Sequence, residues 1–155
     1  MKSKPEIIDS LNFLLKDELT AINQYFVHAE ICEGWGYGPL GDVIEKRSIA
    51  EMKHAEALIA RIIFLEGKPI VSELNPLHIA DDVESMFKND HAAEKTAIDG
   101  YNKVIRQVAD LGDNGTKKFL ENILKDEEDH IDYIEEVLDQ ITQMGIQNFL
   151  TTVTG

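Results

Sequence analysis

The sequence predicts an all-α protein: a four-helix bundle with one long crossover connection and a short fifth helix at the C-terminus. Three observations support this prediction. Apolar residues recur every three, four or seven positions through four long stretches, the period of an amphipathic helix. Short glycine-containing segments join the first stretch to the second and the third to the fourth, so each pair is expected to form an antiparallel hairpin. The segment between the pairs contains two prolines and no clear period, and it is long enough to be a crossover.

The first hairpin is expected to contain helices at residues 5–33 and 40–66. Pro5 suits the first turn of a helix, where a missing amide proton does no harm. The run Gly34-Trp35-Gly36-Tyr37-Gly38-Pro39 ends the first helix, and Gly67-Lys68-Pro69 ends the second.

The second hairpin is expected to contain helices at residues 81–110 and 116–144. Asp81 or Asp82 is a suitable N-cap for the first of these. The turn Gly112-Asp113-Asn114-Gly115 joins the two helices, and Gly145 ends the second. A short fifth helix is expected at 146–153, and the chain 1–155 is expected to form a single domain.

The composition indicates a soluble, acidic protein. Its 29 acidic and 15 basic residues give a net charge of −14, which would repel the phosphates of nucleic acid. An acidic surface can also concentrate cations, and the charge alone does not separate this role from solubility. No apolar run approaches the ~20 residues of a membrane span, so no membrane partner is expected. The single Cys32 rules out an internal disulfide and fits a reducing cytoplasm.

The residues that carry chemistry occur twice, at an offset of 76 positions. A Glu … Glu-x-x-His pattern appears first as Glu18, Glu51 and His54, and again as Glu94, Glu127 and His130. The residues that follow Glu18 and Glu94 also agree, with Thr, Ala and Ile at the second, third and fourth positions of both.

The two turns place each set at one height in the bundle. Gly36 lies 18 residues after Glu18 and 18 before His54, and Gly112 has the same relation to the second set. Residues equidistant from a hairpin turn face each other, and 18 residues of helix span about 27 Å. Within each Glu-x-x-His, residues i and i+3 share a helix face. The spacing therefore predicts six side chains that converge near the middle of the bundle.

Four carboxylates and two imidazoles in a bundle core predict a dinuclear metal site. An unpaired buried charge costs several kcal/mol, whereas two divalent ions would balance four ionised Glu. Oxygen-rich ligation with one imidazole per metal suits iron or manganese, and this donor set is the one known from di-iron and di-manganese bundles. The alternative is a set of surface Glu and His on ordinary amphipathic helices. Two matched copies at the same height argue strongly against it.

Five further side chains have simpler interpretations. Tyr25 and Tyr101 lie seven residues beyond the first Glu of each repeat and so share its face. They are expected to hydrogen-bond ligating carboxylates, to act as redox-active phenols, or to be core tyrosines with a satisfied hydroxyl. His28, His78 and His91 have no such context and are interpreted as surface histidines.

Met52 breaks the repeat, because its counterpart is Glu128. It follows Glu51 directly and so points about 100° away from the metal-facing side. An apolar patch is expected on that outer face, made by Leu19, Ile22, Asn23, Phe26 and Ile49. Sequence alone favours a subunit contact for Met52.

Several motifs give the chain a resemblance to the bacterioferritins over nearly its whole length. They are Asn-Gln-Tyr-Phe at 23–26, Glu-Met-Lys-His-Ala at 51–55, Phe-Leu-Glu-Gly at 64–67, Asp-Glu-Glu-Asp-His-Ile-Asp at 126–132 and Met-Gly-Ile-Gln-Asn at 144–148. The resemblance implies a ferritin-like bundle that assembles into a hollow shell of 24 identical subunits, built from haem-bridged dimers.

The resemblance also implies a function, iron storage and detoxification. A di-iron ferroxidase centre within each subunit would oxidise Fe(II) with dioxygen or peroxide and deposit ferric mineral in the shell. Carried across by position, the iron ligands are Glu18, Glu51, His54, Glu94, Glu127 and His130. Glu51 and Glu127 would bridge the ions, and Glu18 with His54 and Glu94 with His130 would be terminal ligands. Met52 from each of two subunits would bind one haem of the b type, and a ferredoxin-like protein is the expected electron donor for iron release.

The chain departs from the family at three positions. Lys46 and Ala50 stand where some members carry a His and an Asp on the inner surface, so an inner-surface iron site is not expected here. Tyr133 stands where a Trp can follow the second His motif.

Two other classes of protein remain as alternatives. One is a peroxide-reducing or manganese-using enzyme without storage, although a single Cys excludes the cysteine-ligated iron domain of the rubrerythrin type. The other is a DNA-protecting mini-ferritin, which the acidic termini and the ligand set within one subunit oppose.

Overall fold

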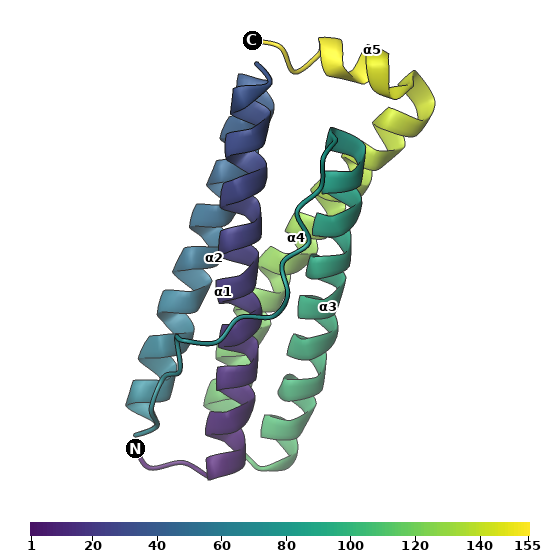
Figure 1. Ribbon diagram of the computed structural model, residues 1–155. Coiled ribbons are helices and arrows are strands. Elements are labelled where there is room, and N and C mark those ends of the chain that lie inside the picture. Colours follow the sequence, from purple (N-terminus) through teal and green to yellow (C-terminus); the bar gives the residue numbers. More distant parts are fainter.

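The computed structural model describes all 155 residues, and its regular structure is entirely helical. The elements are α1 (Pro5–Gly34), α2 (Gly38–Phe64), α3 (Val83–Asp110), α4 (Asn114–Met144) and α5 (Ile146–Thr151). α1 and α4 run upward in Figure 1, α2 and α3 run downward, and the crossover climbs over α1 to reach the top of α3. The predicted four-helix bundle with one long crossover and a short fifth helix is confirmed.

The helix boundaries differ from the predicted ones by at most two residues, for local reasons. α2 begins two residues early because Pro39 fits its first turn. It ends at Phe64 because Glu66 adopts a left-handed backbone with φ of 61°. Asp82, and not Asp81, caps α3 by accepting a hydrogen bond from the Ser85 amide at 2.8 Å. Asp113 caps α4 in the same way and moves its start forward to Asn114.

The two hairpin turns use glycine for the same purpose. Gly36 and Gly112 have φ of 86° and 80°, a left-handed conformation that other residues adopt only with strain. Each turn therefore reverses the chain within a few residues.

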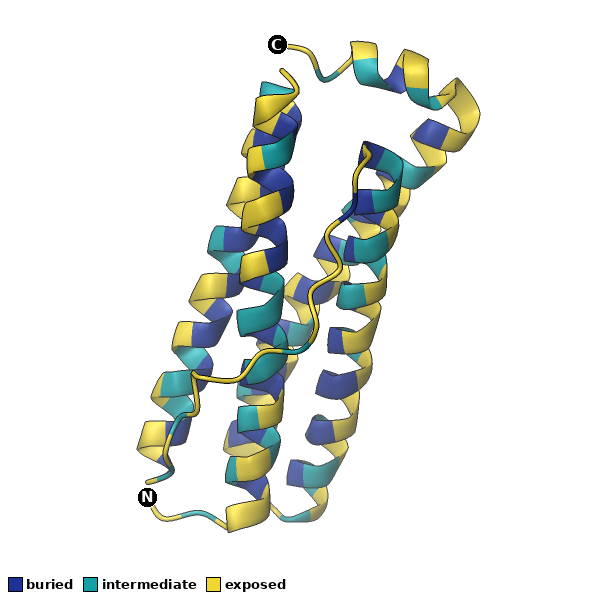
Figure 2. Cartoon of the chain, viewed as in Figure 1, coloured by how far each residue is buried: buried dark blue, intermediate teal, exposed yellow.

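The core consists of two apolar clusters stacked along the bundle. The lower cluster includes Leu11, Leu58 and Val104, and the upper one includes Phe87 and Ile134. Buried residues line the facing sides of the four long helices in Figure 2, and exposed residues face outward. The level of Glu18 and Glu94 lies between the two clusters. A polar site is thus closed above and below by apolar side chains.

The crossover is held by polar side chains of α1. Thr20 Oγ1 accepts a hydrogen bond from the Asn75 amide at 2.9 Å, and Gln24 Oε1 accepts one from the His78 amide at 3.1 Å. His28 Nε2 accepts from the Ala80 amide at 3.2 Å. Positions 20, 24 and 28 lie on one face of a helix, so α1 binds the crossover along its length.

The interpretation of His28 as a surface histidine is wrong. Its side chain is fully buried, and its Nδ1 donates to Asp90 Oδ1 at 3.0 Å while its Nε2 accepts from the crossover. The i, i+4 spacing with Thr20 and Gln24 is the sequence signal for this role. His78 is exposed and His91 is half-buried beside Glu135, at 2.8 Å.

No helix combines the length and the apolar character required to span a bilayer.

Candidate metal centre

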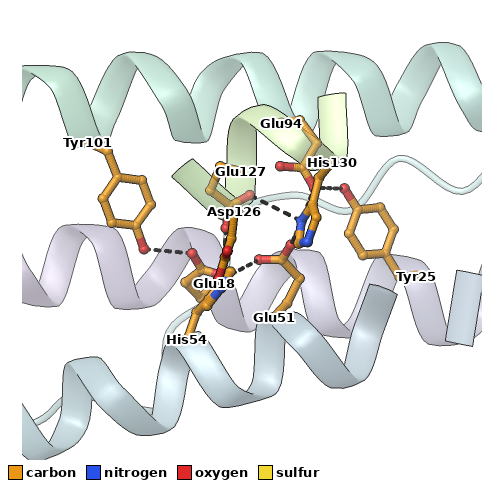
Figure 3. A network of polar contacts seen from close by, with 9 residues as sticks. All are labelled: Glu18, Tyr25, Glu51, His54, Glu94, Tyr101, Asp126, Glu127 and His130. Carbon is orange, nitrogen blue, oxygen red and sulfur yellow. Dashed lines mark hydrogen bonds and ion pairs between the residues drawn. The ribbon is translucent and has the colours of Figure 1, made fainter. Parts of the chain in front are cut away.

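All four long helices contribute to one buried polar site at mid-bundle (Figure 3). α1 and α3 supply one glutamate each, and α2 and α4 supply one Glu-x-x-His each. None of the six side chains is more than 7% exposed: Glu18, Glu51, His54, Glu94, Glu127 and His130. The structure thus brings together every residue that the repeat predicts.

The six residues form two overlapping groups of four. Glu18, Glu51, His54 and Glu127 form one group, and Glu51, Glu94, Glu127 and His130 form the other. Within each group the candidate ligand atoms all lie within 4.8 Å of one another. Glu51 and Glu127 belong to both groups and so occupy the positions that carboxylates bridging two ions would take.

Each histidine contacts the shared glutamate of the other hairpin. His54 Nδ1 lies 2.9 Å from Glu127 Oε1, and His130 Nδ1 lies 2.7 Å from Glu51 Oε1. The two imidazole rings stack with centroids 5.9 Å apart and planes inclined by 22°. In both rings, Nδ1 is the nitrogen that faces the carboxylates and is available to a metal.

Two tyrosines donate hydrogen bonds across the hairpins to the remaining glutamates. Tyr25 Oη donates to Glu94 Oε1 at 2.5 Å, and Tyr101 Oη donates to Glu18 Oε1 at 2.6 Å. Burial raises the pKa of both phenols well above 10.0, so they remain protonated donors. The structure shows two of the roles considered for Tyr25 and Tyr101: both are core residues with a satisfied hydroxyl, and in both the acceptor is a predicted ligand carboxylate.

Three carboxylate oxygens of the site have no hydrogen-bond partner although they are buried. They are Glu18 Oε2, Glu94 Oε2 and Glu127 Oε2. Buried polar atoms are almost always paired, so three unpaired carboxylate oxygens in one small site suit a cation as their partner. The residues present therefore fit a pair of divalent ions.

The electrostatics of the site also require a cation or protons. Burial raises the pKa of Glu51 well above its usual value, and the charges of Glu18, Glu94 and Glu127 raise it further. Burial likewise raises the pKa of Glu94, with Glu127 adding to the effect. Burial lowers the pKa of His54, but its contacts to Glu127 and Glu18 outweigh this and raise it to about 11. Metal binding would therefore displace protons from this site.

Two aspartates beside the site were missed by the sequence analysis. Asp126 Oδ2 lies 3.0 Å from His54 Nε2, on the side of the ring that faces away from the carboxylates. Asp17 precedes Glu18, and its Oδ1 accepts a hydrogen bond from Asn75 Nδ2 at 2.7 Å while its Oδ2 is buried without a partner. Both residues adjoin a predicted ligand in the sequence, and Asp126 also begins one of the motifs that carry the family resemblance.

A cavity of about 580 Å³ lies between α1, α3 and the crossover. A smaller cavity is lined by the glutamates of the site, and the two share Asp17, Ala21 and Ala93. The larger cavity therefore ends where the candidate metal centre begins.

Met52 lies on the outer face of α2 and is 46% exposed. Of its expected apolar patch, Phe26 and Asn23 are exposed and Leu19 and Ile49 are half-buried. Ile22 instead packs in the core at 9% exposure, so the patch is smaller than predicted.

The three departures from the family lie near the site. Lys46 is exposed and Ala50 half-buried on α2. Tyr133 is half-buried, with the Arg47 guanidinium 5.7 Å from its ring centroid.

Four-helix bundles that enclose this twofold set of Glu and Glu-x-x-His side chains define the ferritin-like class. A family profile described as the ferritin-like domain matches residues 8–144 of the chain. A bacterioferritin of Rhodobacter capsulatus is 38% identical over 149 residues, covering 96% of this chain and 92% of that protein. A bacterioferritin of Streptomyces coelicolor is 40% identical over 153 residues, covering 99% and 92%. The chain belongs to the bacterioferritin family.

The crystal structure of the Rhodobacter capsulatus bacterioferritin matches the fold with a TM-score of 0.98 and 36% identity, covering 100% of this chain and 97% of that one. That structure has a metal-free dinuclear site and a haem iron in a crystallographic special position.

Proposed function

We propose that this protein stores and detoxifies iron in the cytoplasm by oxidising Fe(II) to Fe(III) at the dinuclear site. The ferric product would collect as mineral inside a hollow shell of 24 subunits. One observation carries the proposal: two four-residue donor groups share Glu51 and Glu127, an arrangement that suits two ions held side by side. Each Fe(II) supplies one electron, so a pair can reduce dioxygen to the level of peroxide, or reduce peroxide to water.

The side chains of the site have distinct tasks in this reaction. Four ionised glutamates would balance the charge of two Fe(II) ions and would bind Fe(III), a harder ion, more strongly. Tyr25 and Tyr101 hold the terminal glutamates Glu94 and Glu18 in orientation by their hydrogen bonds, which leave the second oxygen of each carboxylate free. The apolar clusters above and below the site limit the access of water.

The cavity beneath the crossover provides a route for Fe(II) to the site. It reaches the smaller cavity at Asp17, whose unpartnered oxygen suits a transient contact with a cation. The net charge of −14 favours the approach of cations over that of anions.

The ferroxidase role is tested with the variants Glu18→Ala and His130→Ala, one from each donor group. We expect both to oxidise Fe(II) far more slowly than the wild type in a stopped-flow assay that follows the ferric product. His91→Ala is the matched control, because His91 pairs with Glu135 at the surface and not with the site. Wild-type rates of Fe(II) oxidation in both site variants would contradict the ferroxidase role.

A b-type haem between two subunits is the second part of the proposal, with Met52 from each subunit as the axial ligand. A thioether is a known haem ligand, and Met52 is exposed on α2, where Ile49 lies one turn before it on the same helix face. A haem iron in a crystallographic special position, as in the relative, is one that symmetry-related subunits share equally. Haem would supply one-electron transfer for iron release, with a ferredoxin-like protein as the donor.

The haem proposal is tested by titrating the protein with haem and recording the Soret band. Met52→Leu, which keeps the apolar volume, is expected to lose the six-coordinate spectrum. Met144→Leu is the control, since Met144 is also exposed. An unchanged spectrum in Met52→Leu would remove Met52 from this role.

The shell is tested separately by size-exclusion chromatography of the native protein. A particle of 24 subunits supports storage, whereas a dimer that never assembles further would favour a ferroxidase without storage.

A further inference from the structure

The two histidines of the site differ in what holds their outer ring nitrogen. His54 Nε2 lies 3.0 Å from Asp126 Oδ2, and this carboxylate sits on α4 immediately before Glu127 (Figure 3). His130 contacts Glu51 through Nδ1, but its Nε2 has no hydrogen-bond partner in the protein. The protein thus contacts both ring nitrogens of His54 but only one ring nitrogen of His130.

The repeat explains the difference. The offset that relates Glu51 to Glu127 relates Ala50 to Asp126. By the twofold symmetry of the two hairpins, residue 50 would meet His130 as Asp126 meets His54. A methyl group cannot accept a hydrogen bond, so the second histidine has no equivalent support.

A hydrogen bond to the outer nitrogen changes how an imidazole binds a metal. It fixes the tautomer with the proton on Nε2, leaves the Nδ1 lone pair for the metal and raises the basicity of the ligand. It also restricts rotation of the ring, so less freedom is lost on binding. Asp126 further adds a negative charge to the Glu18–His54 group alone. Removing such a partner typically lowers metal affinity about 10- to 100-fold.

We propose that Asp126 is a positioning residue for His54 and that Ala50 leaves His130 unsupported, so the two metal positions are unequal. The inference rests on the dinuclear centre proposed above. A divalent ion fills the Glu18–His54 position first and leaves it last. The Glu94–His130 position binds more weakly and is the one that exchanges its ion.

Co²⁺ is the probe, because it does not react with dioxygen as Fe(II) does and its visible absorption reports binding. In the wild type we expect two binding steps whose dissociation constants differ at least about 10-fold. His130→Ala and His54→Ala each remove one histidine, so the step that each variant retains assigns the two constants to the two positions.

Three substitutions then test the inference, two that weaken the support of His54 and one that adds support to His130. Asp126→Ala is expected to weaken the tighter step by about 10- to 100-fold and to leave the weaker step unchanged. Asp126→Asn retains an acceptor oxygen and is expected to fall between Asp126→Ala and the wild type. Ala50→Asp is expected to tighten the weaker step, because it supplies the acceptor that His130 lacks.

Asp129→Ala is the matched control for charge. Asp129 is exposed on the same helix and pairs with Lys125 at 3.6 Å, so the variant removes one negative charge near the site without touching His54. Neither Co²⁺ constant is expected to change in it.

The outcomes distinguish a failure of this inference from a failure of the dinuclear centre on which it rests. Two Co²⁺ constants that are unchanged in Asp126→Ala would overturn the positioning role, even if that variant unfolds more easily, because a purely structural contact would affect stability alone. An equal change in Asp129→Ala would attribute the effect to net charge and would also overturn it. A wild type that binds no Co²⁺ would overturn the dinuclear centre itself.

Discussion

The first hairpin, α1 with α2, and the second, α3 with α4, are alike inside and different outside. Inside, each supplies a Glu and a Glu-x-x-His at the same height, and each sends a tyrosine to the glutamate of the other. Outside, α1 and α2 expose large apolar side chains such as Phe26, Met52 and Phe64, whereas α3 exposes none and α4 only Met144 at its end.

The difference shows that the interior and the exterior of the two hairpins are under different constraints. The interior is matched in its six predicted ligands, because each donor group contains the same residue types, although only His54 has an aspartate on its outer nitrogen. The exterior is free to diverge, and apolar side chains on one hairpin alone mark the side of the subunit that other molecules are expected to cover.

The largest effect is expected from removing a glutamate that both donor groups share. Glu51→Ala and Glu127→Ala are each expected to lower the initial rate of Fe(II) oxidation by more than about 100-fold. Even the loss of a residue that only hydrogen-bonds a ligand lowers metal affinity or activity about 10- to 100-fold. The two effects should agree, because each residue serves both positions. Stopped-flow oxidation measures this, with exposed Glu128→Ala as the control. A large effect in only one variant would show that just one of the glutamates bridges.

A smaller effect is expected from the tyrosines. Tyr25→Phe and Tyr101→Phe each remove a hydrogen bond to a buried carboxyl group, which is worth about 0.5–1.5 kcal/mol for a neutral acceptor and about 1.5–3 kcal/mol for a charged one. Urea unfolding of the metal-free protein should show both losses, equal to within about 0.5 kcal/mol. A difference above about 1 kcal/mol would mean that the symmetry does not extend to these partners.

Much of this molecule could be predicted from sequence because its signals are periodic and repeated. The helices follow from apolar spacing, and the site follows from one offset and two glycine turns. The spacing of His28 from Thr20 and Gln24 places the three on one face of α1, but its contact could not be predicted, because it depends on the path of the crossover, which has no period of its own. Ile22 was assigned to the wrong face, since a residue at the edge of an amphipathic stripe is decided by packing. The contact of Asp126 to His54 required the relative positions of α2 and α4, which single-helix spacing does not supply.

The two hairpins also differ in how their helices begin, and the expected effects on stability are smaller. α3 and α4 begin with side-chain caps from Asp82 and Asp113, while α1 and α2 begin with prolines and no side-chain cap. Asp82→Ala is expected to destabilise the protein by about 1 kcal/mol. Asp113→Ala should cost about 1–2 kcal/mol, because Asp113 also accepts from Thr116 Oγ1. Chemical unfolding measures both, and Asp81→Ala is the control that should change nothing.

The smallest effect expected is the pH dependence of the Asp82 cap. Hydrogen bonds from Ser85 lower the pKa of Asp82 below 3.8, so its ionised form is favoured in the folded state. The stability that this adds is present above pH 3.8 and is lost as the pH falls through the lowered pKa. Melting temperatures of the wild type and Asp82→Ala should therefore converge below that pH. Asp82→Asn, which caps without charge, should lack this convergence.

The polar face of α1 has a consequence for how freely the crossover can vary. Thr20, Gln24 and His28 bind backbone amides of the crossover and not its side chains. Apart from Asn75, the identities of the residues in this segment are therefore not specified by α1. Substitutions there need not loosen the connection, and the side chains of Ile70, Val71 and Leu74 are exposed. A segment without regular structure thus becomes the part of the subunit where new surface chemistry can evolve at the lowest risk to the fold.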